Sequence, residues 1–299
     1  MREAVIVAGA RTPVGKSRKG SLAGVRPDDL GALVVKETLK RAGGYEGNID
    51  DLIIGCAMPE AEQGLNMARN IGGLAGLPDT VPAITINRYC SSGLQSIAYA
   101  AEKIMLGHSD TAIAGGAESM SMVPMMGHVA RPNPTLAETS PEYYMSMGHT
   151  AEEVARKFGI SREDQDAFAV RSHQKAARAI AEGKFTDEIV PVDVVKRSVS
   201  DANKLVEKSF SFATDEGVRE GTSTDVLAKL RPAFNVRGSV TAGNSSQTSD
   251  GAAAVMVMDR EKAGSLGLQP LVRFRSFAVA GVPPEIMGIG PVEAIPKAL

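Results

Sequence analysis

Residues 83–106 read AITINRYCSSGLQSIAYAAEKIML and join two segments of different periodicity. The run 83–86 is short and apolar, as expected of a strand buried on both faces of a sheet. From Ser92 to Leu106 apolar side chains recur along one helical stripe, and Gly107 ends the pattern. This stretch therefore predicts a strand, a tight turn and a helix, the beginning of a parallel βα arrangement.

The same alternation extends over residues 1–118. Further short apolar runs, which we predict to be strands, cover residues 3–8, 52–54 and 111–114. Helix signals agree at both ends of 27–42, which begins with a proline and two aspartates and stops at a glycine pair. The sequence therefore predicts an α/β fold built on a parallel sheet.

Residues 119–248 differ in character, because the first thirty mix Met, Pro and polar residues without either period. Irregular stretches of that length are uncommon unless they are functional. The elements predicted beyond them are helices at 150–158 and 161–182 and strands at 189–194, 252–258 and 271–279. We therefore expect an insertion at 119–248, after which the sheet resumes, and a helix that begins near Pro291.

Length and composition exclude several classes of protein. The chain has 299 residues, 43% of them hydrophobic, and its 33 basic and 35 acidic side chains leave a net charge of −2. No basic run suggests nucleic acid, and no stretch approaches the roughly 18 apolar residues of a membrane span. The N-terminal apolar run is too short for a secretory signal, so we expect a cytoplasmic protein. The two cysteines form no CxxC pair, which argues against a disulfide scaffold or zinc site.

Cys90 lies at the turn between the strand and the helix of the opening stretch. Unpaired amides and the positive dipole end of a helix stabilise a thiolate at such a position, and the small residues that follow would allow a substrate to approach. A buried structural cysteine is the alternative, and it is our interpretation of Cys56. None of the four histidines can be assigned as the base from sequence alone.

Two further motifs admit competing interpretations. Residues 10–17, ARTPVGKS, fit a relaxed phosphate-binding loop, but Pro13 lacks an N–H group, alanine replaces the first glycine and no clear helix follows. These features argue against a nucleoside triphosphatase. Residues 238–251, GSVTAGNSSQTSDG, crowd glycine and small hydroxyl residues before a strand. They could form a ligand-contacting loop or an ordinary polar turn.

Taken in order, several segments resemble the thiolase family, the acyl-CoA C-acyltransferases. The matching segments are VIVAGARTPVGK (5–16), NRYCSSGLQSIAYAAEKI (87–104), GGAESMSMVP (115–124), MGHTAE (147–152), REDQDAFAVRSH (162–173), KLRPAF (229–234), TAGNSSQTSDGAAA (241–254) and MGIGPV (287–292). The first of them resembles the opening strand and loop of that family, which removes the phosphate-loop interpretation. The similarity is strongest to bacterial 3-ketoacyl-CoA thiolases of fatty acid degradation, with acetoacetyl-CoA thiolases close behind.

The resemblance implies a thiolase-like α/β fold of two similar halves in five layers, αβαβα. Residues 1–118 and 249–270 would form the N-terminal half, 119–248 an inserted loop domain that covers coenzyme A, and 271–299 the start of the C-terminal half. The family's NEAF, GHP and C-x-G segments, which carry an asparagine, a histidine and a second cysteine, do not occur. We therefore expect the C-terminal half to be largely missing and the chain as written to be catalytically impaired.

The resemblance also assigns the site. Cys90 would be the acylated nucleophile, with coenzyme A as a substrate and no metal or other cofactor. The residues that would contact the CoA thioester are Met147, Arg219, Phe234, Ala242, Gly243, Ser246 and Met287. Family members are homodimers or homotetramers, and we expect the same association here. The alternatives are a ketoacyl-synthase-like acyltransferase and a non-catalytic fragment that still assembles.

Overall fold

The computed structural model describes residues 2–201 and 203–299. The chain divides into two compact units. The first comprises Met1–Val129, Phe185–Gly217 and Thr248–Arg275, and the second comprises Ala130–Lys184, Val218–Gln247 and Ser276–Leu299. These units group residues by packing, and residues 185–217 pack with the first. The assignment of 119–248 to one inserted domain stays a prediction.

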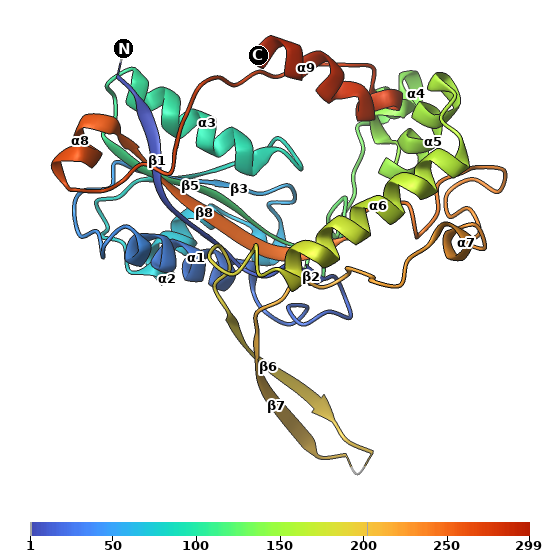
Figure 1. Ribbon diagram of the computed structural model, residues 1–299, viewed down its shortest axis with the longest axis horizontal. Helices are drawn as coiled ribbons and strands as arrows, with labels where there is room; N and C mark the ends of the chain where they lie inside the picture. Colours follow the sequence, from blue (N-terminus) through green and yellow to red (C-terminus); the bar gives the residue numbers. More distant parts are fainter. Residues whose placement is uncertain (1, 202) are drawn as a thin grey trace. The chain divides into compact units, whose positions relative to one another are not determined.

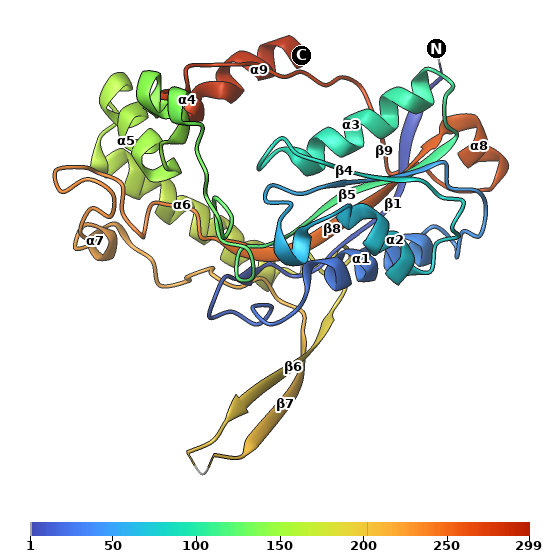
Figure 2. The same cartoon turned by 180° about the vertical axis from the view of Figure 1, so that it is seen from behind.

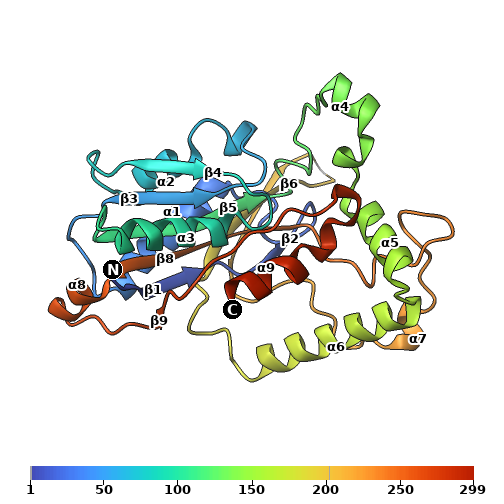
Figure 3. The ribbon, with the colours of Figure 1, turned by 90° about the horizontal axis from the view of Figure 1, so that it is seen from above.

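A mixed sheet forms the centre of the first unit. Its strands are β1 (Ala4–Arg11), β2 (Gly15–Lys16), β3 (Asp51–Gly55), β4 (Ala83–Ile86), β5 (Thr111–Ser119), β8 (Ser249–Asp259) and β9 (Val272–Arg273). The order is β4-β3-β5-β8-β1-β9, with β2 paired to β8 (Figure 3). β3 is parallel to β4 and β5, whereas β8 is antiparallel to both β5 and β1. The four strands predicted within residues 1–118 therefore run in one direction, and β8 between them runs in the other.

Helices cover both faces of this sheet. α3 (Ser92–Met105) lies on one face, and α1 (Pro27–Arg41) and α2 (Met67–Ala75) lie on the other (Figure 1). Successive β3 residues serve opposite faces, as the pleat requires: Leu52 and Ile54 pack in the cluster of α1 and α2, and Ile53 packs in that of α3. The first unit therefore has three layers, αβα, which confirms the predicted α/β class. Two short helices, η1 (Ala61–Gln63) and α8 (Arg260–Ser265), complete it.

A β-hairpin, β6 (Val192–Val199) and β7 (Leu205–Phe212), extends from the first unit (Figure 2). At its base Val192, Val194 and Phe212 are buried in the core, but most of its other side chains are exposed. The predicted strand 189–194 therefore begins too early and ends too soon, and β7 lies where no strand is predicted. The predicted strand 271–279 is likewise reduced to the two residues of β9.

The second unit is helical. Its elements are α4 (Pro134–Thr139), η2 (Pro141–Tyr144), α5 (Met147–Phe158), α6 (Arg162–Ala181), α7 (Thr224–Leu227), η3 (Pro284–Ile289) and α9 (Gly290–Ala298). Ser161 caps α6 by accepting the Asp164 N–H at 3.0 Å, and its hydroxyl donates to the Asp164 carboxylate at 2.8 Å. Within residues 2–201 and 203–299, no helix combines the length and apolar character needed to cross a bilayer.

Candidate active site

Cys90 lies in the loop between β4 and α3, two residues before the helix begins. Its thiol is free and exposed, so the alternative of a buried structural cysteine is wrong at this position. No side chain caps the first turn of α3. The Ser92 N–H already donates to the Tyr89 carbonyl oxygen at 3.0 Å, but the positive end of the helix dipole is available to an anion beside the cysteine.

Glycines let the start of α3 approach the sheet closely. A Cβ placed on Gly55, the last residue of β3, would lie 2.5 Å from the carbonyl carbon of Ser92, and one on Gly116 would lie 3.5 Å from the Cα of Gly93. Real Cβ contacts essentially never fall below 3.0 Å. The position of Cys90 therefore depends on the absence of a side chain beneath the first turn of α3.

The turn itself is held by its own hydrogen bonds. The Ser92 hydroxyl accepts the Arg88 N–H at 2.7 Å and donates to the Tyr89 carbonyl oxygen at 2.6 Å. The Ser91 hydroxyl donates to the Arg88 carbonyl oxygen at 2.9 Å. Tyr89 has φ +45°, a left-handed conformation that a residue with a side chain seldom adopts. The residue before Cys90 is therefore held in an uncommon conformation.

The second cysteine, Cys56, occupies a different environment. It follows β3 and is only 1% exposed, as its interpretation as a structural cysteine requires. Burial, together with the nearby Glu118 carboxylate, raises the pKa of the Cys56 thiol to about 12. Cys56 is therefore protonated at neutral pH and is no nucleophile.

The histidines do not supply an evident base. Among the described residues of the first unit, no hydrogen bond joins the Cys90 sulfur to His108 or His128. In the second unit His149 Nδ1 pairs with the Ser146 hydroxyl at 2.8 Å, and His173 Nδ1 accepts a backbone N–H at 3.2 Å. Nor do three or more His, Cys, Asp or Glu side chains gather as a metal site within 2–201 and 203–299.

The phosphate-loop candidate at 10–17 is filled by the protein's own carboxylates. The Asp215 side chain accepts the Val14 N–H at 2.8 Å, and the Glu216 side chain accepts the Lys16 N–H at 2.8 Å. A phosphate would need these N–H groups and would be repelled by both carboxylates. The geometry therefore excludes a phosphate-binding loop here, in agreement with the sequence argument.

All seven residues predicted to contact the CoA thioester lie in the second unit. Three of them belong to the loop that precedes β8. In this loop the Asn244 side chain accepts the Thr241 N–H at 2.7 Å and donates to the Asp166 carboxylate at 2.9 Å. Asp166 is 4% exposed and is held in turn by Arg162 at 2.7 Å. The loop that presents Ala242, Gly243 and Ser246 is therefore fixed to α6 by the hydrogen bond from Asn244 to Asp166, a carboxylate that is itself paired with Arg162.

A second anchor joins the same loop to α5. The Glu152 carboxylate accepts the N–H groups of Ser239 at 2.9 Å and Val240 at 3.0 Å. Neither Glu152 nor Asp166 is among the site residues predicted from the sequence. The available signal was weak: Asp166 shares the buried face of α6 with Val170, so a charged residue interrupts the only buried stripe of that helix.

The apolar candidates flank α5. Phe234 approaches the His149 ring edge to face, with centroids 6.1 Å apart, and a Cβ on Gly148 would lie 2.2 Å from the Phe234 ring. Met147 is the first residue of α5, and η3, which carries Met287, packs on the same helix. Met147, Phe234 and Met287 are about 40% exposed. Apolar side chains that remain this exposed are available to an apolar ligand.

Arg219 has a simpler setting. Its side chain is exposed, and its backbone N–H donates to His173 Nδ1. The structure thus brings Ala242, Gly243 and Ser246 into one anchored loop. It places Met147 and Phe234 at the start of α5. It gives Arg219 no contact with the other candidates among the interactions of the described residues.

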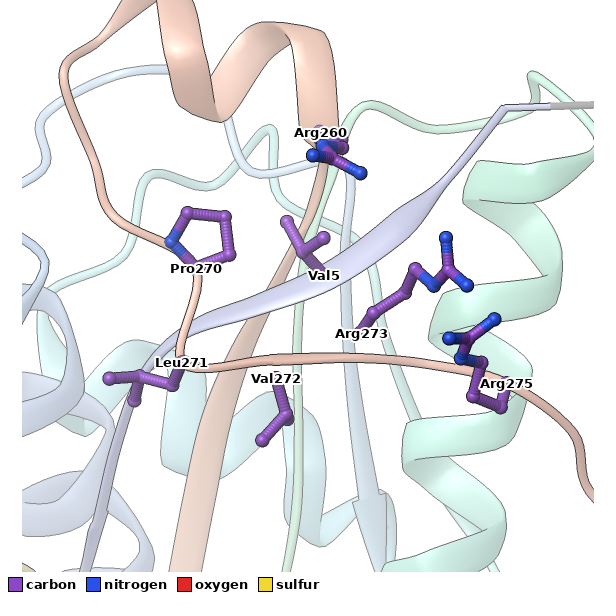
Figure 4. Close-up of a pocket in the computed structure, with 7 residues that line it drawn as sticks. All are labelled: Val5, Arg260, Pro270, Leu271, Val272, Arg273 and Arg275. Carbon is purple, nitrogen blue, oxygen red and sulfur yellow. The ribbon is translucent and has the colours of Figure 1, made fainter.

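An open hollow of about 440 Å³ lies elsewhere in the first unit (Figure 4). It is lined by Val5, Arg260, Pro270, Leu271, Val272, Arg273 and Arg275. Arg260 and Arg273 share the single Glu3 carboxylate, which offsets one of their two positive charges. No predicted site residue lines this hollow, and we do not assign the active site to it.

Comparison with known proteins agrees with this geometry. The family described as "Thiolase, N-terminal domain" matches residues 4–261. The 3-ketoacyl-CoA thiolase of Bacillus subtilis is 80% identical over all of this chain, which covers 76% of that protein. The acetyl-CoA acetyltransferase of Pseudomonas aeruginosa is 44% identical, with 77% of its length covered. The crystal structure of the Bacillus anthracis acetyl-CoA acetyltransferase superposes with a TM-score of 0.87 at 40% identity, covering 100% of this chain and 76% of that one. By fold and by sequence, this chain belongs to the thiolase family.

Proposed function

We propose that this chain transfers acyl groups between coenzyme A thioesters, cleaving a 3-ketoacyl-CoA with CoA or running the reverse condensation. The observation that carries the proposal is the exposed thiol of Cys90 at the uncapped N-terminus of α3. Its chemistry suits a thioester intermediate, since thiolates are strong nucleophiles and helix N-termini favour anions. The names of the relatives support the same reaction class.

The reaction proceeds in two halves. The Cys90 thiolate attacks the 3-keto carbon, the bond between C2 and C3 breaks, and the two-carbon fragment leaves as the acetyl-CoA enolate, which takes up a proton. The acyl group remains as a thioester on Cys90. The thiol of free CoA then gives up its proton, attacks this thioester and releases the acyl-CoA and the Cys90 thiolate.

Negative charge develops on the substrate oxygen in both halves. Backbone N–H groups at the start of α3 are fixed before the substrate arrives, because Ser92 and the glycines beneath the turn hold them in place. Removing one such donor typically costs about 3–4 kcal/mol of transition-state stabilisation. We assign the Cys90 N–H to this role.

We assign CoA binding to the second unit. Ser246 in the anchored loop would contact the pantetheine, with Ala242 and Gly243 allowing close approach, and the exposed guanidinium of Arg219 would face the nucleotide end. Met147, Phe234 and Met287 would line the acyl and pantetheine channel, where methionine adapts its shape to a flexible chain. We also propose that the protein is a cytoplasmic homodimer or homotetramer. It would use no cofactor besides its CoA substrates.

Turnover needs a base for the Cys90 thiol and an acid for the enolate. No histidine of the first unit is bonded to Cys90 among its described residues. We therefore propose that these 299 residues turn over slowly, although Cys90 can still take up an acyl group.

The test is intact mass spectrometry before and after mixing with acetoacetyl-CoA, with peptide mapping and a Cys90→Ser control. An acetyl adduct on Cys90, absent in the control, supports the proposal. CoA binding without an adduct would overturn it in favour of a non-catalytic thiolase-fold protein. Full steady-state thiolysis by the same chain would overturn only the proposed impairment.

A further inference from the structure

The residue before Cys90 needs an external constraint. Tyr89 has φ +45°, which is disfavoured for any residue with a Cβ. Its side chain is 67% exposed, so packing of the ring does not hold the backbone there. Hydrogen bonds to the backbone of the turn must therefore maintain this conformation, and with it the direction of the following residue, Cys90.

Asn87 supplies such a constraint. Its Oδ1 accepts the Tyr89 N–H at 2.8 Å, and its Nδ2 donates to the Ala57 carbonyl oxygen at 3.0 Å. Both ends of the side-chain amide are thus used, one on the turn and the other on the segment that follows β3. Asn87 is itself exposed, so its orientation depends on these two bonds rather than on burial.

The segment that holds Asn87 is fixed from below by Glu118 at the end of β5. The Glu118 carboxylate accepts the Ala57 N–H at 2.6 Å and the Met58 N–H at 3.3 Å. It also accepts from Gln63 Nε2 at 2.6 Å. Gln63 is fully buried, and its Oε1 accepts the Ser119 N–H at 2.6 Å. A continuous chain of hydrogen bonds therefore runs from the rigid sheet to the turn before Cys90.

We propose that Asn87 is a positioning residue for the Cys90 nucleophile. It transmits the fixed position of the Glu118-anchored segment to Tyr89, and so holds the Cys90 thiol at the N-terminus of α3. The inference rests on the proposed function, in which Cys90 carries the acyl group. It predicts that Asn87 affects the rate of acylation rather than the affinity for CoA.

The experiment measures the rate of Cys90 acetylation by acetoacetyl-CoA, using rapid quenching and intact mass. Asn87→Ala is expected to slow acetylation about tenfold or more, because displacements of an ångström at a reacting group cost up to about a hundredfold. CoA affinity is expected to stay within about twofold. Asn48→Ala is the matched control, because Asn48 is another exposed asparagine with a side-chain hydrogen bond, before β3.

Tyr89→Gly makes the test specific. Glycine adopts positive φ without a steric cost, so the turn no longer needs Asn87 to hold it. In the Tyr89→Gly background, Asn87→Ala is therefore expected to change acetylation by less than about threefold. A general loss of folding would slow both backgrounds equally. Should Asn87→Ala unfold, Asn87→Ser replaces it, with a smaller slowing that again vanishes in the glycine background.

Two results would overturn the inference: acetylation of Asn87→Ala within twofold of wild type, or equal slowing in both backgrounds. Failure of the proposed function looks different, because wild-type Cys90 would then take no acetyl group. In that case the positioning role is judged from the rate of Cys90 alkylation by iodoacetamide, compared between wild type and Asn87→Ala in both backgrounds. Equal alkylation of wild type and Asn87→Ala would then reject it.

Discussion

Replacing Gly55 by alanine tests whether close packing beneath α3 sets the position of Cys90. The new Cβ would lie 2.5 Å from the Ser92 carbonyl carbon and 2.7 Å from the Gly93 nitrogen, whereas ordinary contact begins at 3.4 Å. The start of α3 must therefore withdraw by about 0.9 Å, the difference between 3.4 and 2.5 Å. Overpacking of this kind costs roughly 1–3 kcal/mol of stability, and an ångström of displacement costs up to about a hundredfold in rate.

The assay pairs urea unfolding with the rate of Cys90 acetylation. Gly73→Ala is the matched control, because Gly73 lies in α2 and a Cβ there meets nothing within 4 Å. In that open helical position alanine should stabilise the protein by about 0.5–1 kcal/mol and leave acetylation unchanged. If Gly55→Ala is as stable as wild type and its Cys90 is acetylated at the wild-type rate, the claim that backbone contact beneath the first turn positions the nucleophile is refuted.

Three further predictions concern the two cysteines, Glu152 and Asp259. At pH 8, iodoacetamide should add one group per native chain, mapped by mass spectrometry to the exposed Cys90, because burial raises the pKa of Cys56 to about 12; a second adduct on the folded chain would contradict this. Each oxygen of the Glu152 carboxylate accepts one backbone N–H group, and Glu152→Gln replaces one of these oxygens by an NH2 group that can only donate. Calorimetry should therefore find CoA binding weakened about tenfold. Unchanged affinity would mean that the loop does not bind CoA. Burial raises the pKa of Asp259, but the bond and charge of Arg2 and the N–H groups of Lys262 and Glu261 together outweigh burial and leave that pKa lowered. Asp259 therefore stabilises the fold at neutral pH and loses that effect as the pH falls. Asp259→Asn keeps a helix cap and should cost about 1 kcal/mol at pH 7, and this difference from wild type should shrink below about pH 3.8; a constant difference across pH would reject the assignment.

Local signals explain which elements could be predicted. The helix predicted at 27–42 is α1, Pro27–Arg41, and the strand predicted at 83–86 is β4 with the same bounds. Proline at the start, glycine at the end and a clear period are all encoded within the segment itself. Such elements need no knowledge of their neighbours.

Elements that depend on distant partners were predicted less well. β5 was expected to end at Ala114 but continues to Ser119, through two glycines and a glutamate that have little strand propensity. Pairing with β8 and with the end of β3 extends it. The pairs with β8 join residues more than a hundred positions apart, and those with β3 join residues about sixty apart. The direction of β8 also depends on where the chain re-enters the sheet, which periodicity does not encode.

The site divides in the same way. The position of Cys90 at a strand-to-helix turn follows from residues 83–106 alone, whereas the roles of Glu118 and Asn87 do not. Glu118 lies in the part of β5 beyond the predicted strand 111–114, and its partners Ala57 and Gln63 are more than fifty residues away in the chain. No spacing rule joins these residues, because the sheet brings them together.

Two of the three small residues after Cys90, Ser92 and Gly93, have a packing role, whereas Ser91 remains exposed. We expected them to open space for a substrate, but Ser92 is 3% exposed and its hydroxyl bonds within the turn. Gly93 faces Gly115 and Gly116 of β5. Their small size is therefore needed beneath the helix, where it lets α3 lie close to the sheet. A substrate can reach Cys90 because the loop that carries it is exposed. The Cys90 thiol is placed accurately because the contacts beneath that loop are buried.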